Sequence, residues 1–247
     1  MSLDHTKRTY EKFGREDPLY AVLTTEQFRN NRGDEGEFFA SGRDEIARLM
    51  ERVGQAGIEV AHGRALDFGC GVGRLSQALA DHFAAVVGVD IAASMVERAR
   101  AANRHGDRVQ YVVNAVDDLR VLESASFDFV YSNITLQHVP PEAGRRYIAE
   151  FLRVLRPGGA TVFQVPSGRP YPAGGWQALL YRVRRQYLRR LWKTLRGKPP
   201  YEMHYVPRAD VEQIVTGAGG RLVKVDDVGR KPGKNFMYYV VKPPASA

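Results

Sequence analysis

Short apolar runs alternate with amphipathic helical patterns along most of the chain. Runs that predict strands lie at 65–68, 86–89, 109–113, 127–131 and 160–165. Patterns with helical spacing lie between them, at 75–83, 93–102 and 142–155. Strands that alternate with helices return to the sheet by crossovers, so this order predicts a doubly wound, mostly parallel α/β sheet. Arg156-Pro-Gly-Gly159 predicts a turn between the last of these helices and its strand.

The carboxyl-terminal part departs from this alternation. A helical pattern at 210–217 is followed by strand patterns at 221–225 and 236–241, and only the segment 229–235 connects these two strands. Two strands that are joined without a helix pair antiparallel or lie apart. We therefore predict a seven-stranded, Rossmann-like sheet that ends in an antiparallel hairpin.

Residues 1–62 have a mostly helical pattern and precede the sheet. An apolar stripe lies within 44–53, and Ser41 with Asp44 offers an N-cap signal before it. We interpret this part as a helical preface, in which aromatic residues are candidates for a cover over a bound ligand, although core packing explains them equally well. These aromatic residues are Tyr10, Tyr20, Phe38 and Phe39.

The composition is that of an ordinary globular protein, with 44% hydrophobic and 26% charged residues. No apolar run approaches the roughly 18 residues that span a bilayer. The amino terminus lacks an apolar signal core, so we expect a cytoplasmic protein. Cys70 is the only cysteine, which excludes an intrachain disulfide and a thiolate cluster, and we expect no bound metal.

The net charge of +8 is concentrated in one segment. Residues 169–198 include nine basic residues and no acidic ones, which leaves 27 basic and 28 acidic residues elsewhere. Within this segment, residues 176–198 have apolar positions at helical spacing with basic residues largely opposite, which predicts a basic amphipathic helix. We place this helix in an insertion at 169–206, within a domain that spans 63–247.

Four interpretations of the basic helix are open at the level of sequence. Its apolar face packs as a lid over a pocket, with a solvated basic rim, or its arginines bind an anionic acceptor. The arrangement of Trp and Leu opposite Arg and Lys also suits the surface of an anionic membrane. Phosphate contacts to RNA are the fourth interpretation, although no RNA-recognition module accompanies the helix.

The segment 66–74, Leu-Asp-Phe-Gly-Cys-Gly-Val-Gly-Arg, combines an acid with three glycines. Asp67 stands at the end of the first apolar run, where we expect a parallel strand to deliver it into a crevice. The glycines let the backbone turn tightly and approach a ligand, and the helical pattern that follows places the loop at a helix N-terminus. An acid before such a loop suits a ligand with a cation there, which points to S-adenosylmethionine.

A nicotinamide fingerprint is the main rival for this loop. It requires the spacing G-x-G-x-x-G, whereas Gly73 comes one position early and Arg74 follows it. Asp67 also has no role beside a pyrophosphate. Tight-turn glycines, together with Asp90 as a helix N-cap, are the alternative without a ligand. The single cysteine further excludes the iron–sulfur enzymes that use S-adenosylmethionine as a radical source.

From about Arg64 to its last strand, the chain resembles the class I S-adenosylmethionine-dependent methyltransferases. The resemblance rests on five ordered segments: Leu66-Asp-Phe-Gly-Cys-Gly-Val-Gly73, Val87-Gly-Val-Asp90, Asn114-Ala-Val-Asp-Asp-Leu119, Phe127-Asp-Phe-Val-Tyr-Ser-Asn-Ile-Thr-Leu-Gln-His138 and Leu152-Arg-Val-Leu-Arg-Pro-Gly-Gly159. One glycine loop is a weak signal, whereas five segments in the right order are a strong one. The resemblance implies S-adenosylmethionine as the cofactor and S-adenosylhomocysteine as its product.

The resemblance also implies a role for each part of the donor site. Asp67 and the loop backbone hold the methionine end, since its ammonium prefers a carboxylate and its carboxylate prefers free N–H groups. Asp90 accepts both ribose hydroxyls, and Asn114, where the family often has Asp, accepts from the adenine amino group. The implied cofactor-binding residues are Asp67, Gly69, Cys70, Gly71, Gly73, Asp90, Ile91, Met95, Asn114, Ala115, Val116 and Asn133.

The adenine ring is expected between apolar side chains and a backbone edge. Ile91 and Met95 would pack on its faces, because Met adapts its shape easily, and the backbone of Ala115 and Val116 would complete its edge. Ala92 stands where the family often has Ser or Thr, which removes a hydroxyl that caps the following helix.

The acceptor is less well defined by motifs. The Asn/Asp-Pro-Pro-aromatic signature of enzymes that methylate planar nitrogens is missing, and Ser132-Asn-Ile-Thr135 stands in its place. A cytosine C5 mechanism needs a free cysteine, and Cys70 belongs to the loop, so we expect no DNA partner. His138 either acts as a general base for an acceptor hydroxyl or caps its loop and shapes the pocket. Candidates for substrate binding are Tyr20, His138, Trp176 and His204.

We therefore predict a methyltransferase that moves a methyl group from S-adenosylmethionine to oxygen on a small-molecule or lipid-linked acceptor. An anionic acceptor and a peripheral contact of 176–198 with an anionic membrane are further predictions. The alternatives are an RNA methyltransferase that uses this basic helix and an S-adenosylmethionine-binding protein without catalysis. Methyl transfer from a sulfonium needs alignment and exclusion of water more than catalytic side chains, so motifs say little about the acceptor.

Overall fold

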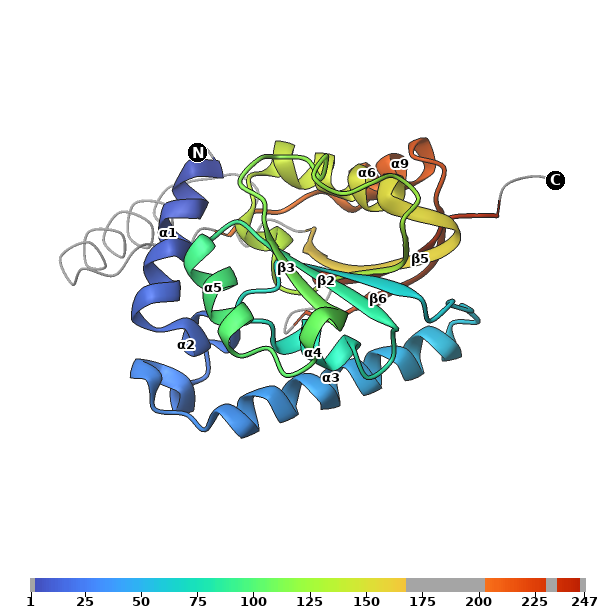
Figure 1. Ribbon diagram of the computed structural model, residues 1–247. Helices are drawn as coiled ribbons and strands as arrows, with labels where there is room; N and C mark the ends of the chain where they lie inside the picture. Colours follow the sequence, from blue (N-terminus) through green and yellow to red (C-terminus); the bar gives the residue numbers. More distant parts are fainter. Residues whose placement is uncertain (1–2, 168–202, 230–234, 245–247) are drawn as a thin grey trace, which may run out of the picture.

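The computed structural model describes residues 3–167, 203–229 and 235–244 (Figure 1). Within these residues, seven strands form one sheet in the order β3-β2-β1-β4-β5-β7-β6. The strands are β1 (Arg64–Phe68), β2 (Ala85–Asp90), β3 (Val109–Val113), β4 (Phe127–Ser132), β5 (Leu155–Pro166), β6 (Arg221–Asp227) and β7 (Asn235–Val241). β1 to β5 pair in parallel, and β7 lies antiparallel between β5 and β6. The predicted α/β sheet with an antiparallel terminal hairpin is confirmed.

Helices cover both faces of this sheet, as Figure 1 shows. One face is covered by α3 (Glu35–Gln55), α4 (Arg74–Leu79) and α5 (Ala93–Ala101). The other face is covered by α6 (Pro141–Val154) and α9 (Arg208–Gly217). Among the described elements there are also α1 (Leu3–Glu16), α2 (Pro18–Leu23) and the short helices η1 (Glu26–Asn31), η2 (Gly106–Arg108) and η3 (Leu136–His138).

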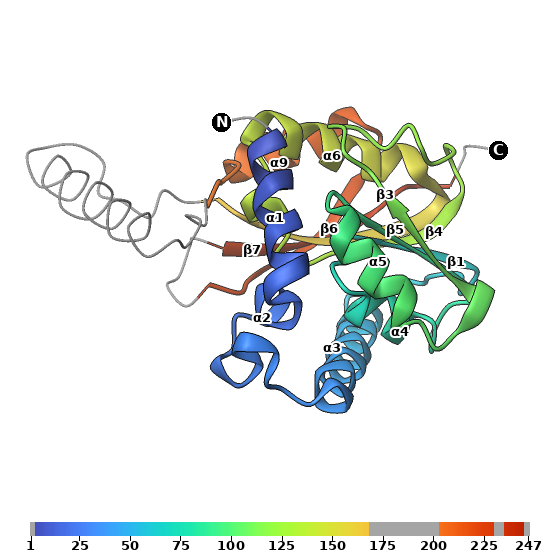
Figure 2. The ribbon, with the colours of Figure 1, turned by 60° about the vertical axis from the view of Figure 1, so that its left-hand side comes forward.

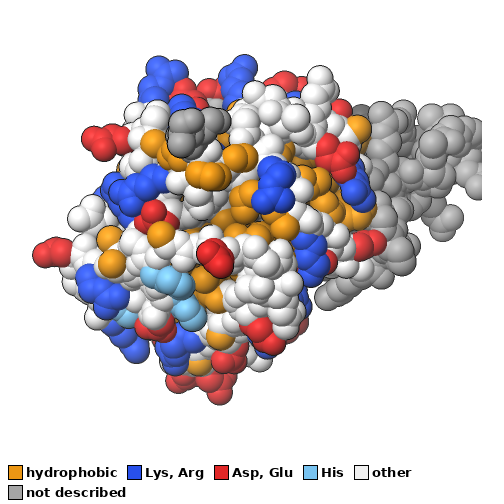
Figure 3. All heavy atoms as spheres, turned by 90° about the vertical axis from the view of Figure 1, so that its right-hand side faces the viewer, with side chains coloured by type: hydrophobic (Ala, Val, Ile, Leu, Met, Phe, Trp, Pro, Cys, Tyr) orange, Lys and Arg blue, Asp and Glu red, His pale blue; other side chains and the backbone are white. Residues whose placement is uncertain are grey.

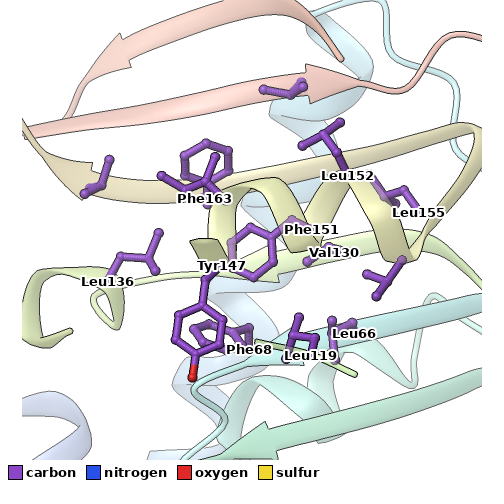
Figure 4. Packing of buried hydrophobic residues seen from close by; sticks show 14 of the residues in the cluster. Leu66, Phe68, Leu119, Val130, Leu136, Tyr147, Phe151, Leu152, Leu155 and Phe163 are labelled. Atoms are coloured by element: carbon purple, nitrogen blue, oxygen red, sulfur yellow. The ribbon is translucent and has the colours of Figure 1, made fainter. Parts of the chain in front are cut away.

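The strand residues explain why the sheet needs two helical layers. Leu66 and Phe68 of β1 pack in the cluster under α6 and α9, whereas Ala65 packs on the side of α3 and α4. In the first cluster, the ring of Phe68 lies 4.5 Å from that of Tyr147 and 5.1 Å from that of Phe151 (Figure 4). Neighbouring side chains of a strand point to opposite faces, so a parallel strand that is buried on both faces reads as a continuous apolar run.

The first turn of α3 lies upstream of the predicted cap. The side chain of Asp34 accepts a 2.8 Å hydrogen bond from the backbone N–H of Glu37 and is the N-cap. Ser41 and Asp44, the predicted cap signal, lie inside the helix, where the Ser41 hydroxyl donates to the carbonyl of Phe38. The prediction of the cap was wrong because the buried face of the helix continues upstream to Phe38.

The segment 156–159 is part of a strand rather than the predicted turn. β5 begins at Leu155, and its pairing with β4 is interrupted by a register shift at Asp128. The Asp128 carboxylate accepts hydrogen bonds from the backbone N–H of Arg64 and from the guanidinium of Arg156, at 2.6 and 3.0 Å. The Pro-Gly-Gly sequence therefore forms a strand irregularity that a buried carboxylate holds in place.

The surface in Figure 3 carries basic and acidic side chains that are interspersed, with hydrophobic side chains gathered near the middle of the face. This mixture fits the near balance of charges outside 169–198. Trp176 and the predicted helix 176–198 lie outside the described residues. The four interpretations of that helix therefore stay predictions, as does the division of the chain into a preface, a domain and an insertion.

α1 packs against α5, which lies alongside it in Figure 2. α5 begins after Ala92, whose side chain cannot cap a helix. Glu11 of α1 takes this role, because its carboxylate accepts from the first two backbone N–H groups of α5, at 2.6 and 3.2 Å. Arg98 of α5 in turn donates to the carbonyl of Gly14 at 2.6 Å. A carboxylate from another helix thus replaces the missing cap hydroxyl.

Replacing Glu11 by Ala is expected to lower the free energy of unfolding by about 1 kcal/mol, because α5 loses its cap. Urea unfolding followed by circular dichroism measures this change. Glu97, an exposed acid on α5, provides the matched control. Glu97→Ala should change the free energy by less than about 0.5 kcal/mol. Equal stability of Glu11→Ala and wild type would contradict the proposed cap.

Candidate functional site

A cavity opens where the order of the strands reverses. β1 lies between β2 and β4, and such a reversal leaves a crevice at the carboxyl ends of the strands. We call this cavity the first cavity; the loop after β1, the end of β2, the segment after β4, α1 and α2 surround it. Its lining includes Gly69, Cys70, Gly71, Asp90, Asn114, Asn133 and His138.

The glycine loop has a backbone that other residues adopt with difficulty. Gly69 and Gly71 have φ angles of 79° and 54°, in the left-handed region. A Cβ on Gly69 would lie 2.2 Å from the side chain of Thr135, which also lines the first cavity. Between the two glycines, burial raises the pKa of the Cys70 thiol, so this residue is a packing group rather than a nucleophile.

Asp90 joins the glycine loop to the start of α5. Its Oδ2 accepts from the backbone N–H of Gly71 and its Oδ1 from that of Ala92, each at 2.9 Å. Burial raises the pKa of Asp90, and these backbone hydrogen bonds oppose the rise. Each carboxylate oxygen keeps a further lone pair, so Asp90 can also accept from two hydroxyl groups of a ligand.

The amide nitrogen of Asn114 donates hydrogen bonds to the backbone of the protein itself. Its Nδ2 donates to the carbonyls of Asp118 and Val116, at 2.7 and 3.3 Å, and the side chain is buried. A carboxylate cannot donate to these carbonyls, which explains why asparagine suits the position. The amide oxygen on the other side of the group is an acceptor for a ligand. Ala115 and Val116 themselves are exposed and do not line the first cavity.

Asp67 lies beneath the glycine loop and does not line the first cavity. It alternates with Leu66 and Phe68 along β1, so it points to the face of the sheet that α4 covers. There the hydroxyl of Ser76 donates to its carboxylate at 2.6 Å. The side chain is 1% exposed, and burial raises its pKa to about 7, against the lowering effects of Ser76 and Arg74.

Two of the other predicted cofactor residues line the first cavity, and one does not. Ile91 and Met95 both line it, and they pack in one cluster with Ala92. Gly73 instead precedes the first turn of α4 and is not part of the lining. The first cavity is therefore lined by only some of the residues that the motifs assigned to cofactor binding.

His138 lies in η3, below α1, and lines the first cavity. Its carbonyl accepts from the hydroxyl of Thr6 at 3.1 Å, and its ring centroid lies 5.8 Å from that of Tyr10. The amide nitrogen of Gln137 is 3.1 Å from its Nε2. Because an amide nitrogen only donates, Nε2 is the acceptor in this contact. For Nε2 of His138 to act as a base, its hydrogen bond with the amide of Gln137 must first break.

The other substrate candidates lie apart from the first cavity. The ring of Tyr20 packs under the guanidinium of Arg29, which also donates to its hydroxyl at 3.1 Å. Val22, two residues later, lines the cavity instead. His204 donates its backbone N–H to a carbonyl of η3 at 2.7 Å. Trp176 is not among the described residues.

α1 contributes lining residues for which the sequence offers little signal. They are Leu3, Thr6 and Tyr10. Tyr10 was a candidate for a cover, whereas Leu3 and Thr6 belong to no motif. Their position depends on the docking of α1 against α5, which no local pattern encodes.

Glu45 of α3 makes a second link between the preface and the sheet, and sequence reasoning missed it. Its carboxylate accepts from the guanidinium of Arg74 at 2.6 Å, from Nδ2 of Asn133 at 2.7 Å and from the hydroxyl of Tyr131 at 3.2 Å. Arg74 is only 4% exposed, so the pair orders the start of α4 and the end of β4 together. Nothing in a helical pattern distinguishes such an acid from a solvated one.

A second cavity adjoins the first, and Asn133 and Ile134 line both. Its volume is about 690 Å³, within the roughly 300–1,000 Å³ that is usual for small-molecule sites. The first cavity has a volume of only about 110 Å³. The second cavity is lined by Glu45, Arg48, Arg52, Tyr131, Gln164 and Met203, among others.

Two further properties concern only the part of the chain that the structure describes. In 3–167, 203–229 and 235–244, no three His, Cys, Asp or Glu side chains form a group that could hold a metal. No helix in these ranges is long and apolar enough to cross a membrane.

The raised pKa of Asp67 predicts how it affects stability as pH changes. In the unfolded chain this carboxyl titrates near pH 4, and in the folded protein its pKa is about 7. The folded state therefore binds more protons between these values, so the contribution of Asp67 to the free energy of unfolding falls as pH rises through this window.

We expect Asp67→Asn to remove this loss. Between pH 5 and pH 8, urea unfolding should show that the variant loses less stability than wild type, by more than about 1 kcal/mol. Asp81→Asn changes an exposed carboxylate and should behave as wild type. The same pH dependence in wild type and Asp67→Asn would show that Asp67 is ionised throughout.

Comparisons with known sequences agree with this geometry. A family model described as a methyltransferase domain matches residues 66–163. A ubiquinone biosynthesis O-methyltransferase of Xanthomonas euvesicatoria pv. vesicatoria (strain 85-10) is 31% identical over 199 residues, which are 75% of this chain and 79% of that protein. A malonyl-[acyl-carrier protein] O-methyltransferase of Enterobacter lignolyticus (strain SCF1) is 28% identical over 157 residues, which are 64% of this chain and 54% of that protein.

Solved structures share the fold. The magnesium protoporphyrin IX methyltransferase of Synechocystis PCC 6803, with bound S-adenosylmethionine, has a TM-score of 0.59 at 17% identity, with 98% of each chain covered. The PH0226 protein of Pyrococcus horikoshii OT3 has a TM-score of 0.60 at 20% identity, with 94% of this chain and 98% of that one covered. The chain belongs to the class I S-adenosylmethionine-dependent methyltransferases, and S-adenosylmethionine is its methyl donor.

Proposed function

We propose that this methyltransferase acts on an oxygen atom of a small-molecule or lipid-linked acceptor. The observation that carries the proposal is that the two sequence relatives described above, from Xanthomonas euvesicatoria and Enterobacter lignolyticus, are both named O-methyltransferases. The sequence after β4, Ser132-Asn-Ile-Thr135, supports it, since it lacks the proline-rich signature of enzymes that methylate planar nitrogens.

We propose the first cavity as the donor site, because its polar groups fit the donor. Asp90 offers acceptor oxygens for ribose hydroxyls, and Asn114 offers an amide oxygen for the adenine amino group. Ile91 and Met95 supply apolar surface beside them. When bound, S-adenosylmethionine supplies a methyl carbon whose bond to sulfur breaks, with the electron pair staying on sulfur, as the acceptor oxygen forms the new bond.

The narrowness of the first cavity supports a role for α1 as a cover. Its volume of about 110 Å³ is below the usual range for ligand sites, which suits a cover formed by α1 that moves outward to admit the donor. Glu11 and Arg98 hold α1 in the closed position. Once closed, Leu3 and Tyr10 add apolar surface that keeps water from the reacting groups.

His138 is the proposed general base for a hydroxyl acceptor. It lines the first cavity from η3, a helix that begins two residues after Ile134, which lines both cavities. A hydroxyl that is methylated must release its proton, and an imidazole can take it. A carboxylate acceptor has no proton to release and would leave the His138 ring with the structural role of packing against Tyr10 of α1.

Asp90→Asn is expected to weaken the binding of S-adenosylhomocysteine at least tenfold, because the amide replaces one acceptor oxygen by a donor. Isothermal titration calorimetry measures the affinity. Asp81→Asn, on the surface, should leave it unchanged. Wild-type affinity in Asp90→Asn would overturn the placement of the donor site. Failure of the wild type to bind more tightly than the millimolar range would overturn the proposed function itself.

His138→Ala is expected to lower methyl transfer by about 10²-fold or more while it leaves the affinity for S-adenosylhomocysteine within twofold of wild type, because a base contributes to the chemical step. The assay follows label from tritiated S-adenosylmethionine into a metabolite extract. His62→Ala, an exposed histidine, provides the control. Full activity of His138→Ala would leave only the structural role.

A further inference from the structure

We infer that the second cavity binds the methyl acceptor, and that this acceptor has an apolar body that carries an anionic group. The inference rests on the proposed function, since it names the acceptor site of that reaction. Methyl transfer requires the reacting atoms to lie within about 3–3.5 Å of each other. The acceptor must therefore occupy space that is continuous with the donor site, and the second cavity shares Asn133 and Ile134 with the first.

Ile134 marks the boundary between the two cavities. Its φ angle is 63°, in the left-handed region, which is an outlier for a β-branched residue and is unfavourable. The backbone N–H of Ile134 donates to Oε1 of Gln164 at 2.9 Å, and the Gln164 amide nitrogen donates to Asn235. β5 and β7 thus hold the strained residue in place, and its side chain remains 44% exposed.

Apolar side chains that remain in contact with solvent gather at the second cavity. Ile134, Met203 and Val228 are exposed large hydrophobic residues, and all three line it. Met237 and Tyr239 of β7 contribute further to the lining. Exposed apolar surface that is concentrated in one hollow is typical of a binding site, because scattered surface residues would not meet there. The body of the ligand is therefore apolar.

One face of α3 supplies the charges of this cavity. Glu45, Arg48 and Arg52 recur at helical spacing and all line it. The charge of Glu45 is used within the protein, because its carboxylate accepts from Arg74, Asn133 and Tyr131.

Arg48 and Arg52 are exposed at the rim of the second cavity, one helical turn apart. Arg52 also lies beside the phenol of Tyr239. Burial raises the pKa of this phenol, and the positive charge of Arg52 opposes that rise. Two guanidinium groups at one rim favour a carboxylate or phosphate on the ligand, because both anions accept from the planar fork of donors.

The test uses 8-anilinonaphthalene-1-sulfonate, a fluorescent probe with an apolar body and an anionic group. We expect it to bind wild type, and we expect Arg48→Glu/Arg52→Glu to weaken this binding at least tenfold. Arg43→Glu makes the same change at an exposed position of α3 that is not in the cavity lining, and it should stay within twofold of wild type. If the double variant unfolds, Arg48→Ala and Arg52→Ala replace it, each with an expected loss of about threefold.

Competition identifies the anion. Decanoate and decyl phosphate are expected to displace the probe, the stronger of the two identifying the anion, whereas decanol should displace it at least tenfold less effectively. Equal displacement by decanol would overturn the anionic group. Wild-type binding of the probe to the Arg48/Arg52 variants, or an equal loss in Arg43→Glu, would overturn the site.

The affinity for S-adenosylhomocysteine, measured on the same proteins, separates this inference from the proposed function. We expect all of these variants to bind S-adenosylhomocysteine as wild type does, since Arg48 and Arg52 do not line the first cavity. If wild type binds it and the probe is insensitive to Arg48 and Arg52, only the acceptor site is wrong. If wild type fails to bind it, the proposed function fails whatever the probe shows.

Discussion

The carboxylate of Asp90 is the contact on which the site depends. Its two oxygens hold the backbone of Gly71 and of Ala92, so the glycine loop and the start of α5 have one common anchor. The loop in turn approaches the segment after β4 so closely that a side chain at Gly69 would meet Thr135. One half-buried acid at the end of β2 therefore sets the distance between three segments that come from three different strands. A ligand that binds Asp90 therefore meets three segments that the protein has already positioned relative to one another.

Two further acids, both from the preface, complete this framework. Glu11 caps α5 and holds α1 over the first cavity, and Glu45 joins Arg74 to the end of β4. The preface is therefore part of the site rather than an addition to it. Within it, α1 lines the first cavity, and α3 lines the second.

Several features of the site follow from local sequence. Apolar runs identified the strands, because strands that are buried on both faces need apolar residues throughout. The glycines, Asp90 and Asn114 follow strand ends, and parallel strands bring their carboxyl ends to one edge of the sheet. The position of Asp67 beneath the loop follows from its alternation with Leu66 and Phe68, so the expectation that it enters the crevice overlooked a local rule. The N-cap of α3 at Asp34 was also missed, although a capping Asp is a signal in the local sequence.

The sequence by itself determined the order of the strands and helices along the chain, the donor and the residues at the strand ends that line the first cavity. All of these depend on side-chain period, on turn chemistry or on the nearest strand end. Only the tertiary structure decided that Glu11 replaces the cap absent at Ala92, that Glu45 is the partner of the buried Arg74 and that Ile134 adopts a left-handed backbone between two cavities. Each of these depends on a contact between segments that lie far apart in the chain, and neither periodicity nor spacing records which partner such a residue will meet.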